Sequence, residues 1–250
     1  MYIYVVSTGR TGTSFLSEQL NTHLPQLKLT HQQQGSRIIN IVANLPLTNS
    51  VYLSFIAFLF KLFGRGYPPH STIDPLLSMA IYKLIKYGRI DRDNCLIVHL
   101  VRSPGTFVTS FMNWKRQSFK RTILHHLVPF WNPVPVFHAY PFLSWMRMSK
   151  FEKFCWVWNY KNNCYFELSN HNYMLLRMED LFKLETTKQT VKELASFLGQ
   201  ELDDAISLED SNQTNKSNPK KFPPFQEWTD QQKQIMYDHC KKLMKIMKYE

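Results

Sequence analysis

A group of glycines, hydroxyl residues and one arginine lies close to the start of the chain. It comprises Gly9, Arg10, Thr11, Gly12, Thr13 and Ser14. Glycine has no Cβ atom, so the backbone at Gly9 and Gly12 can curl around an anion. Hydroxyls and free N–H groups at the N-terminus of a following helix attract phosphate or sulfate. The spacing therefore predicts an anion cradle, in which the forked guanidinium of Arg10 holds an oxygen atom at two points.

This loop differs from the Walker A motif of nucleotide triphosphatases. That motif has four residues between its glycines and a lysine before the hydroxyl residue. Here two residues separate Gly9 from Gly12, and no lysine precedes Thr13 or Ser14. The difference disfavours magnesium-dependent nucleotide chemistry. The loop alone does not identify a function, because Gly-rich turns with Ser and Thr also serve only to cap helices.

A second predicted anion site follows the apolar run at residues 96–101, which indicates a buried strand. Arg102 comes directly after this run, and Pro104 and Gly105 mark a turn. A helix from about Thr106 brings Ser110 about one turn into that helix. The Ser110 hydroxyl could then share an anion with Arg102.

Strands that lead into anion-binding turns predict a P-loop-like α/β fold. Residues 2–6 alternate aromatic with β-branched side chains, which indicates a first buried strand. We expect one domain over residues 1–250, with a mostly parallel sheet flanked by helices on both faces. Ligands would then lie outside the carboxyl ends of the strands, where both loops begin.

The two loops together resemble the sulfotransferases that use 3′-phosphoadenosine 5′-phosphosulfate. In that family the first loop grips the 5′-phosphosulfate, and a later Arg and Ser, eight residues apart like Arg102 and Ser110, grip the 3′-phosphate. Residues 174–182 resemble the family's strand that ends in Glu-Asp-Leu, and Trp228 and Thr229 open a final helix much as in the family. The resemblance extends from residue 2 to about 247. It implies metal-independent, in-line transfer of a sulfuryl group to a hydroxyl or amine acceptor.

The family resemblance also suggests further site residues. The acceptor's general base is a His or Glu, which in several branches follows the second strand. We expect that strand at residues 26–30, which makes His31 the candidate base, with His70 as the alternative. Lys220 and Lys221 precede the last helix and are candidates for the 3′-phosphate, although the Arg-Lys-Gly triplet of cytosolic members is absent.

Two segments are predicted to be loops. Residues 111–160 hold five of the six tryptophans and are broken by prolines, which is typical of a lid or of an acceptor-pocket wall. The same aromatic and basic composition suits a module that binds single-stranded nucleic acid, and this is one alternative reading. Residues 209–224 are polar and are expected to form a mobile loop. A nucleotide kinase or other phosphotransferase is the second alternative. The sequence does not distinguish a carbohydrate, a lipid or another small molecule as acceptor.

The charge balance and the cysteines bear on partners and compartment. The net charge of +11 indicates an anionic partner, which the donor nucleotide satisfies without any nucleic acid. Four cysteines without zinc-ligand spacing favour a reduced cytoplasmic setting, as does a first strand that begins at residue 2, which leaves no room for a signal peptide. The apolar stretch at residues 51–63 is too short to span a bilayer. It is expected to be a core helix or a pocket wall, with peripheral membrane contact as the less favoured alternative.

Overall fold

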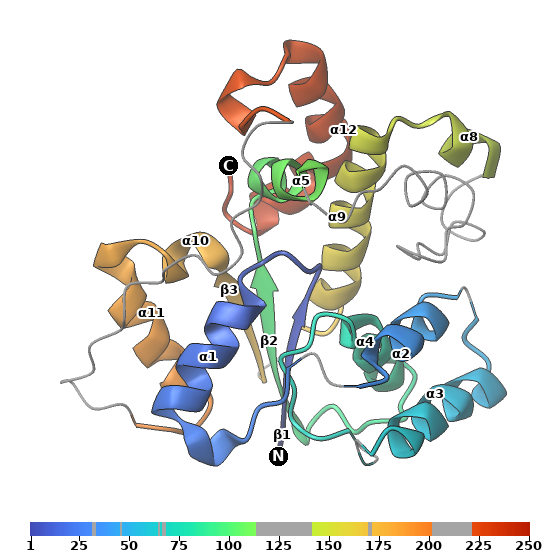
Figure 1. Ribbon diagram of the computed structural model, residues 1–250, viewed down its shortest axis with the longest axis vertical. Helices are drawn as coiled ribbons and strands as arrows, with labels where there is room; N and C mark the ends of the chain where they lie inside the picture. Colours follow the sequence, from blue (N-terminus) through green and yellow to red (C-terminus); the bar gives the residue numbers. More distant parts are fainter. Residues whose placement is uncertain are drawn as a thin grey trace.

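The fold comes from a computed structural model, which describes residues 1–31, 34–45, 47–64, 66, 69–113, 142–169, 172–201 and 222–250. Three strands form its sheet: β1 (Tyr2–Ser7), β2 (Cys95–Val101) and β3 (Tyr173–Arg177). The α-helices are α1 (Thr13–His23), α2 (Ser36–Ala43), α3 (Ser50–Leu62), α4 (Ser78–Lys86), α5 (Pro104–Met112), α8 (Phe142–Arg147), α9 (Lys150–Phe166), α10 (Met178–Leu181), α11 (Leu184–Phe197) and α12 (Asp230–Ile246). Two short 3₁₀ helices are η1 (Pro25–Leu27) and η2 (Phe225–Glu227). Figure 1 shows the helices gathered around the central sheet.

The three strands are parallel and lie in the order β1-β2-β3. In the register of the sheet Ser7 pairs with Leu100, and Leu100 pairs with Leu176. The carboxyl ends of all three strands therefore lie in one row along one edge of the sheet. This confirms the predicted parallel sheet and brings the turns after β1 and β2 together.

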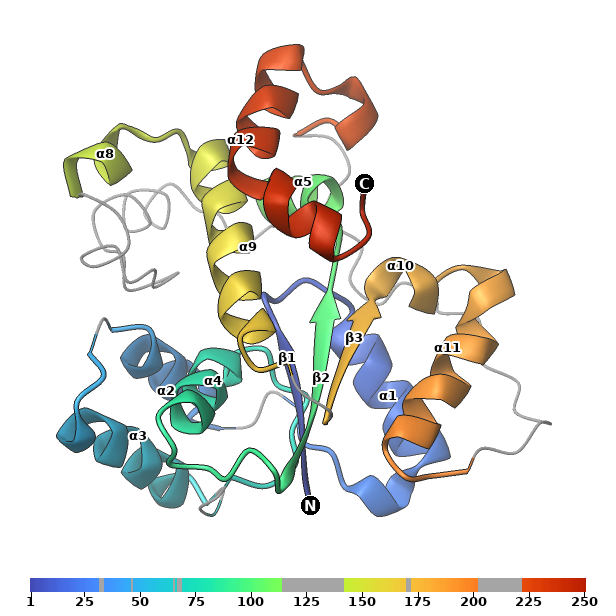
Figure 2. The ribbon, with the colours of Figure 1, turned by 180° about the vertical axis from the view of Figure 1, so that it is seen from behind.

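Alternation of side chains along the strands explains why helices cover both faces of the sheet. Ile3 and Val5 point to one face, where they pack with apolar residues of α1 and α11. Tyr4 and Val6 point to the other face, where residues of α2, α3, α4 and α9 pack against them. Figures 1 and 2 show these two groups of helices on opposite sides of the strands. The α/β architecture expected from the sequence is confirmed.

Two short segments extend the sheet beyond β1. Thr72 forms a parallel bridge with Tyr4, and Thr30 forms another with Thr72. The strand predicted at residues 26–30 is wrong apart from the bridge at Thr30. Pro25 begins η1 there, and Lys28 adopts a left-handed conformation with φ of 47°, which breaks an extended chain.

Several other sequence predictions can be compared with the fold. The helix expected at residues 51–63 forms as α3 and packs one side into the core, while its other side is exposed. All four cysteines are free and buried. Among the described helices, none combines the length and apolar character needed to cross a bilayer. Of the aromatic segment predicted at residues 111–160, residues 114–141 lie outside the described residues, and the part from residue 142 on is mostly helical, in α8 and α9. Of the polar loop predicted at residues 209–224, residues 209–221 lie outside the described residues.

Candidate functional site

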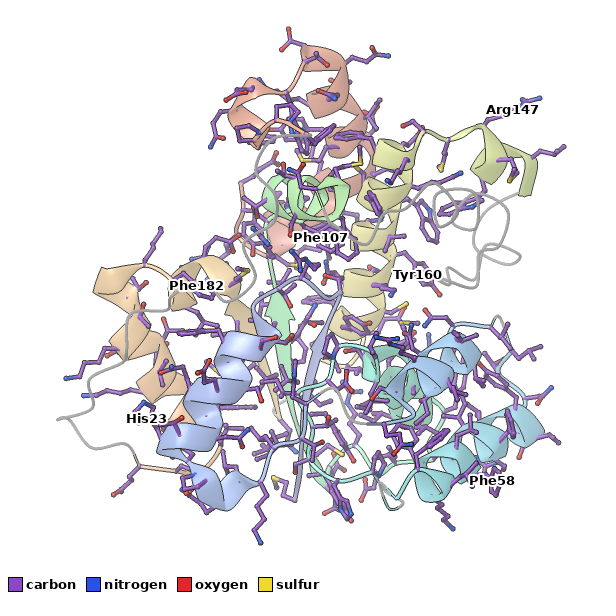
Figure 3. All side chains as sticks on the ribbon, in the orientation of Figure 1. His23, Phe58, Phe107, Arg147, Tyr160 and Phe182 are labelled. Carbon is purple, nitrogen blue, oxygen red and sulfur yellow. The ribbon has the colours of Figure 1, made fainter. Side chains whose placement is uncertain are left out.

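The turn between β1 and α1 has the backbone shape of an anion cradle. Gly9, Arg10 and Gly12 all have positive φ, at 84°, 57° and 81°. At Gly12 a Cβ atom would lie 3.0 Å from the ring of Phe182, which follows α10. Figure 3 labels Phe182 close to the start of α1. Glycine at position 12 is therefore required both by the backbone conformation and by the close approach of that ring.

Hydroxyl groups in this turn are buried without hydrogen-bond partners. The Oγ1 atoms of Thr8 and Thr11 are both of this kind, and Thr11 is fully buried. Gly12 is the N-cap of α1 and offers no side-chain acceptor to the first-turn amides of that helix. A buried polar group without a partner is costly, so these hydroxyls and amides are suited to an anionic ligand.

The turns after β1 and β2 are in direct contact. Nε of Arg10 donates to Oγ of Ser110 on α5 at 3.2 Å. Nη1 of Arg102 donates to the backbone carbonyl of Arg10 at 2.9 Å, and its Nε donates to Oγ1 of Thr106 at 3.0 Å. The structure therefore brings Arg10, Arg102 and Ser110 together as the spacing suggested. Ser110 bonds Arg10 here rather than sharing a partner with Arg102.

Two guanidinium groups concentrate positive charge at this edge of the sheet. Burial lowers the pKa of both Arg10 and Arg102, and their mutual repulsion lowers that of Arg102 further. The carboxylate of Glu179 opposes this effect on the pKa of Arg102. That carboxylate also accepts from the backbone N–H of Ser103 at 2.9 Å and from the hydroxyl of Tyr249. Glu179 thus caps the turn, and one negative charge lies against two positive charges.

The chain before α12 docks on α5. The side-chain amide of Asn113 makes two hydrogen bonds with the backbone of Phe222, at 2.8 and 2.9 Å. A Cβ atom on Gly105 would lie 2.8 Å from the ring of Phe225, so the first turn of α5 fits closely against η2. Lys220 and Lys221 precede Phe222 in the sequence and lie outside the described residues.

His31 follows Thr30, which the bridges through Thr72 place level with Tyr4 in the middle of β1, so His31 is about level with Val5. Thr30 lies two strand positions from β1, so the chain there runs about 10 Å from it. Nε2 of His31 is buried without a partner. Burial lowers the pKa of His31, and the carboxylate of Asp74 partly opposes this. The imidazole is therefore neutral at pH 7 and has a free nitrogen, which is the state a proton acceptor needs.

Two other histidines, His70 and His99, lie elsewhere. Pairing of Thr72 with Tyr4 places His70 level with Tyr2, at the amino ends of the strands and away from the loops. His99 is fully buried and bonds the hydroxyl of Tyr173 and the side chain of Asn162. His99 is therefore a core histidine.

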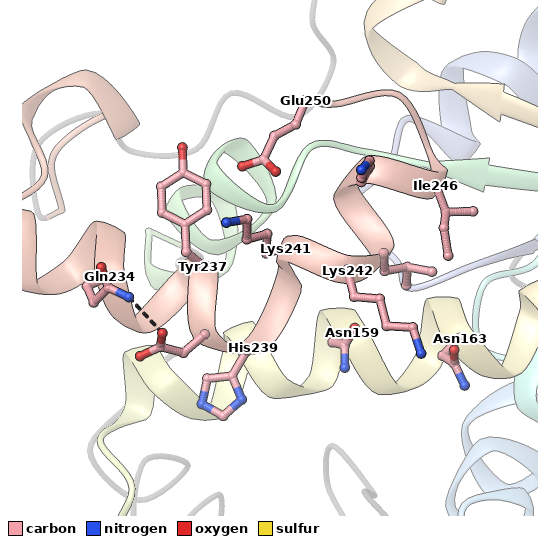
Figure 4. Close-up of a pocket in the computed structure, with 12 residues that line it drawn as sticks. Asn159, Asn163, Gln234, Tyr237, His239, Lys241, Lys242, Ile246 and Glu250 are labelled. Atoms are coloured by element: carbon pink, nitrogen blue, oxygen red, sulfur yellow. Dashed lines mark hydrogen bonds between the residues drawn. The ribbon is translucent and has the colours of Figure 1, made fainter.

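A separate groove of about 1050 Å³ lies between α9 and α12. Figure 4 shows Lys242 of α12 lying over Asn159 and Asn163 of α9, with His239 further along the groove. Of the residues predicted for the anion site, none that the structure describes lines this groove. It is a surface feature of the α9–α12 contact and is distinct from the two loops.

Some features of the site were not anticipated from the sequence. Thr8 was not singled out, although its position directly before Gly9 is a usable signal. Asp74 was likewise not assigned to the site, but its carboxylate is fully buried, accepts a hydrogen bond from Ser36 and opposes the lowering of the pKa of His31. Within the described part of the chain, no three His, Cys, Asp or Glu side chains gather in a way that could hold a metal ion.

Comparison with known proteins gives one result for almost the whole chain. A family model described as "Sulfotransferase domain" matches residues 2–246. No curated protein and no solved structure matched the chain.

Proposed function

This chain belongs to the sulfotransferase domain family, and on that premise we propose that it takes its sulfuryl group from 3′-phosphoadenosine 5′-phosphosulfate. The acceptor would be a hydroxyl or amine on a carbohydrate, a lipid or another small molecule. The observation that carries the proposal is the contact between the two anion loops, through Arg10, Arg102 and Ser110. A donor with phosphate groups at both ends of its ribose needs two adjoining anion sites of this kind.

The residues of the first loop fit the 5′-phosphosulfate. Unpartnered hydroxyls of Thr8 and Thr11 and the free amides of Thr13 and Ser14 offer donors to its oxygens. The cradle assigned to this group comprises Gly9, Arg10, Thr11, Gly12, Thr13 and Ser14. Hydrogen bonds from preorganised backbone amides to an anion are strong because the donors need no rearrangement.

The second loop is assigned to the 3′-phosphate. Arg102 is held in place by two hydrogen bonds and lies next to Ser110 on the same helix-turn unit. Lys220 and Lys221 are proposed as further contacts, because Asn113 fixes the next residue, Phe222, on α5. Together these groups would bind and orient the nucleotide.

The proposed catalytic residues are Arg10 and His31. When bound, the donor supplies an activated sulfuryl group, whose bond to the phosphate oxygen breaks as a bond from the acceptor oxygen to sulfur forms. Arg10 and the loop amides would stabilise the negative charge that gathers on the departing phosphate oxygen. His31 would take the proton of the acceptor hydroxyl on its free Nε2, which leaves an imidazolium beside Asp74. Neither the stabilisation of the leaving oxygen nor the removal of the acceptor proton needs a metal ion in this proposal.

Thermal-shift titration tests the donor assignment without knowledge of the acceptor. Adenosine 3′,5′-bisphosphate should raise the melting temperature in a concentration-dependent way without magnesium. ATP with magnesium and a single-stranded oligonucleotide serve as the competing ligands. A larger shift with ATP and magnesium would favour a phosphotransferase, and a larger shift with the oligonucleotide would favour a nucleic-acid-binding module.

A further inference from the structure

Helix α3 presents a row of large apolar side chains to solvent. Val51, Phe55, Phe58 and Leu62 are spaced four, three and four residues apart, which places them on one face of a helix. They are exposed by 81%, 47%, 53% and 60%. Figure 3 labels Phe58 on the side of α3 that faces away from the sheet. We name these four side chains the α3 outer face.

The opposite side of α3 already accounts for the place of this helix in the core. Tyr52, Leu53, Ile56, Leu59 and Phe60 are all buried against α2, α4 and the sheet. The α3 outer face therefore adds nothing to that packing. A contiguous exposed apolar face on a surface helix marks a site of association.

Basic residues predominate over the stretch of chain that contains this helix, and the exposed acids Asp91 and Asp93 follow directly after that stretch. From Gln19 to Ile90 the sequence holds seven Lys or Arg residues and a single acid, Asp74, which is fully buried. Lys61 lies on α3 itself, and Arg37 lies on the neighbouring α2. Arg89 bonds Ser50 at the first turn of α3. All three of these basic residues are exposed.

We propose that the α3 outer face docks on an anionic lipid bilayer. The apolar side chains would enter the boundary between headgroups and acyl chains, and the basic residues would lie against anionic headgroups. Charge complementarity favours this occupant over a second copy of the chain, because the same face on a second copy would bring its own basic residues against these. The helix would lie in the plane of the interface rather than cross the bilayer.

Docking would also orient the chain toward the bilayer. Phe63, the C-cap of α3, packs against Gly35, so closely that a Cβ atom on Gly35 would overlap its ring. Gly35 follows His31 by four residues and begins α2. A docked α3 would therefore hold the turn with the candidate base close to the membrane. This orientation rests on the proposed function, whereas the docking itself does not.

Co-sedimentation with vesicles tests the docking. Wild-type protein should sediment with phosphatidylcholine vesicles that contain phosphatidylserine, and at least tenfold less with phosphatidylcholine alone. The double variant Phe55→Ser/Phe58→Ser should lose at least tenfold in affinity, and so should Arg37→Glu/Lys61→Glu. The matched control is Leu143→Ser/Ile246→Ser, which removes two exposed apolar side chains from other helices and should bind as wild type does.

Several outcomes would contradict the proposed membrane docking. Equal binding by wild type and by Phe55→Ser/Phe58→Ser would overturn the proposal, as would no binding to either kind of vesicle. A dimer in light scattering that the same variant converts to monomer would assign the face to a second copy. Circular dichroism checks that each variant is folded. Should the double variant fail to fold, Val51→Gln, at the most exposed position of the row, carries the same test.

Because adenosine 3′,5′-bisphosphate binds without a membrane, its thermal shift separates the two proposals. Phe55→Ser/Phe58→Ser should keep the full shift with this nucleotide. A missing shift in wild type would contradict the donor assignment and leave vesicle binding to be judged by itself.

Discussion

Replacing Arg102 by Ala should weaken the binding of adenosine 3′,5′-bisphosphate by about ten- to a hundredfold. A hydrogen bond between a charged donor and a phosphate contributes about 1.5 to 3 kcal/mol, which corresponds to that range of affinity. The fold should persist, because the hydrogen bonds lost are those to the Arg10 carbonyl and to Thr106. Isothermal calorimetry gives the affinity, and thermal unfolding checks the fold.

The matched control for this substitution is Arg92→Ala. Arg92 precedes β2, at the opposite end of the strand from Arg102, and donates to the carbonyl of Ser169 at 2.7 Å. Both variants remove one arginine that flanks β2, but only Arg102 lies at the loop edge of the sheet. Affinity in Arg92→Ala should equal that of wild type.

A second ligand distinguishes direct contact from a loosened loop. Arg102 also holds the carbonyl of Arg10, so its loss could weaken the first loop indirectly. Adenosine 5′-phosphate lacks the 3′-phosphate, and Arg102→Ala should hardly change its affinity. An equal loss for both nucleotides would show that Arg102 acts only through the loop, and a folded variant with unchanged affinity for the bisphosphate would refute its assignment altogether.

Three further predictions concern Gly12, His31 and Lys161, a buried residue of α9. Gly12→Val should abolish nucleotide binding in calorimetry, because the added Cβ atom would lie 3.0 Å from the ring of Phe182. The control Gly88→Val has a similar φ of 69° but faces open space, and it should bind the nucleotide normally. His31→Ala should bind the bisphosphate normally yet turn over about a hundred to ten thousand times slower. The wild-type rate should fall as the imidazole gains a proton, with an apparent pKa below 6.5 because burial lowers it; an acid limb retained in the variant would exclude His31 as base. Burial lowers the pKa of Lys161 to about 8, which corresponds to about 3 kcal/mol against its usual 10.5, so Lys161→Met should be the more stable protein at pH 7. In urea unfolding, the difference in unfolding free energy between the variant and wild type should shrink between about pH 8 and 10, because the folded wild type already carries a neutral amine there. A difference that stays constant with pH would contradict the burial of this charge.

Strands and turns were the part of the fold that the sequence predicted best. Alternation along residues 2–6 and the apolar run at 96–101 are local signals, and both strands form where expected. The prediction of a strand at residues 26–30 was wrong. The apolar spacing there resembles that of a strand, whereas Pro25 and the left-handed Lys28 turn the chain. The sequence of α3 does not show which side of the helix meets solvent, because most of its residues are apolar.

The candidate site shows the same division between local and long-range information. Positive φ at Gly9 and Gly12 follows from residue type, and the helix after Arg102 follows from Pro104 and Gly105. The bond from Arg10 to Ser110 joins residues a hundred positions apart, so only the register of the sheet reveals it. The effect of Asp74 on the pKa of His31 depends likewise on the Thr72 and Thr30 bridges, which no sequence pattern predicts.

A structure of the complex with adenosine 3′,5′-bisphosphate is the most direct test of the donor assignment. It needs no acceptor, and it locates both phosphates at once. The 5′-phosphate should lie over the turn at residues 9–14, in contact with the hydroxyl of Thr11, and the 3′-phosphate should contact Arg102. Phosphates bound in the groove between α9 and α12, with the two loops left empty, would contradict the account.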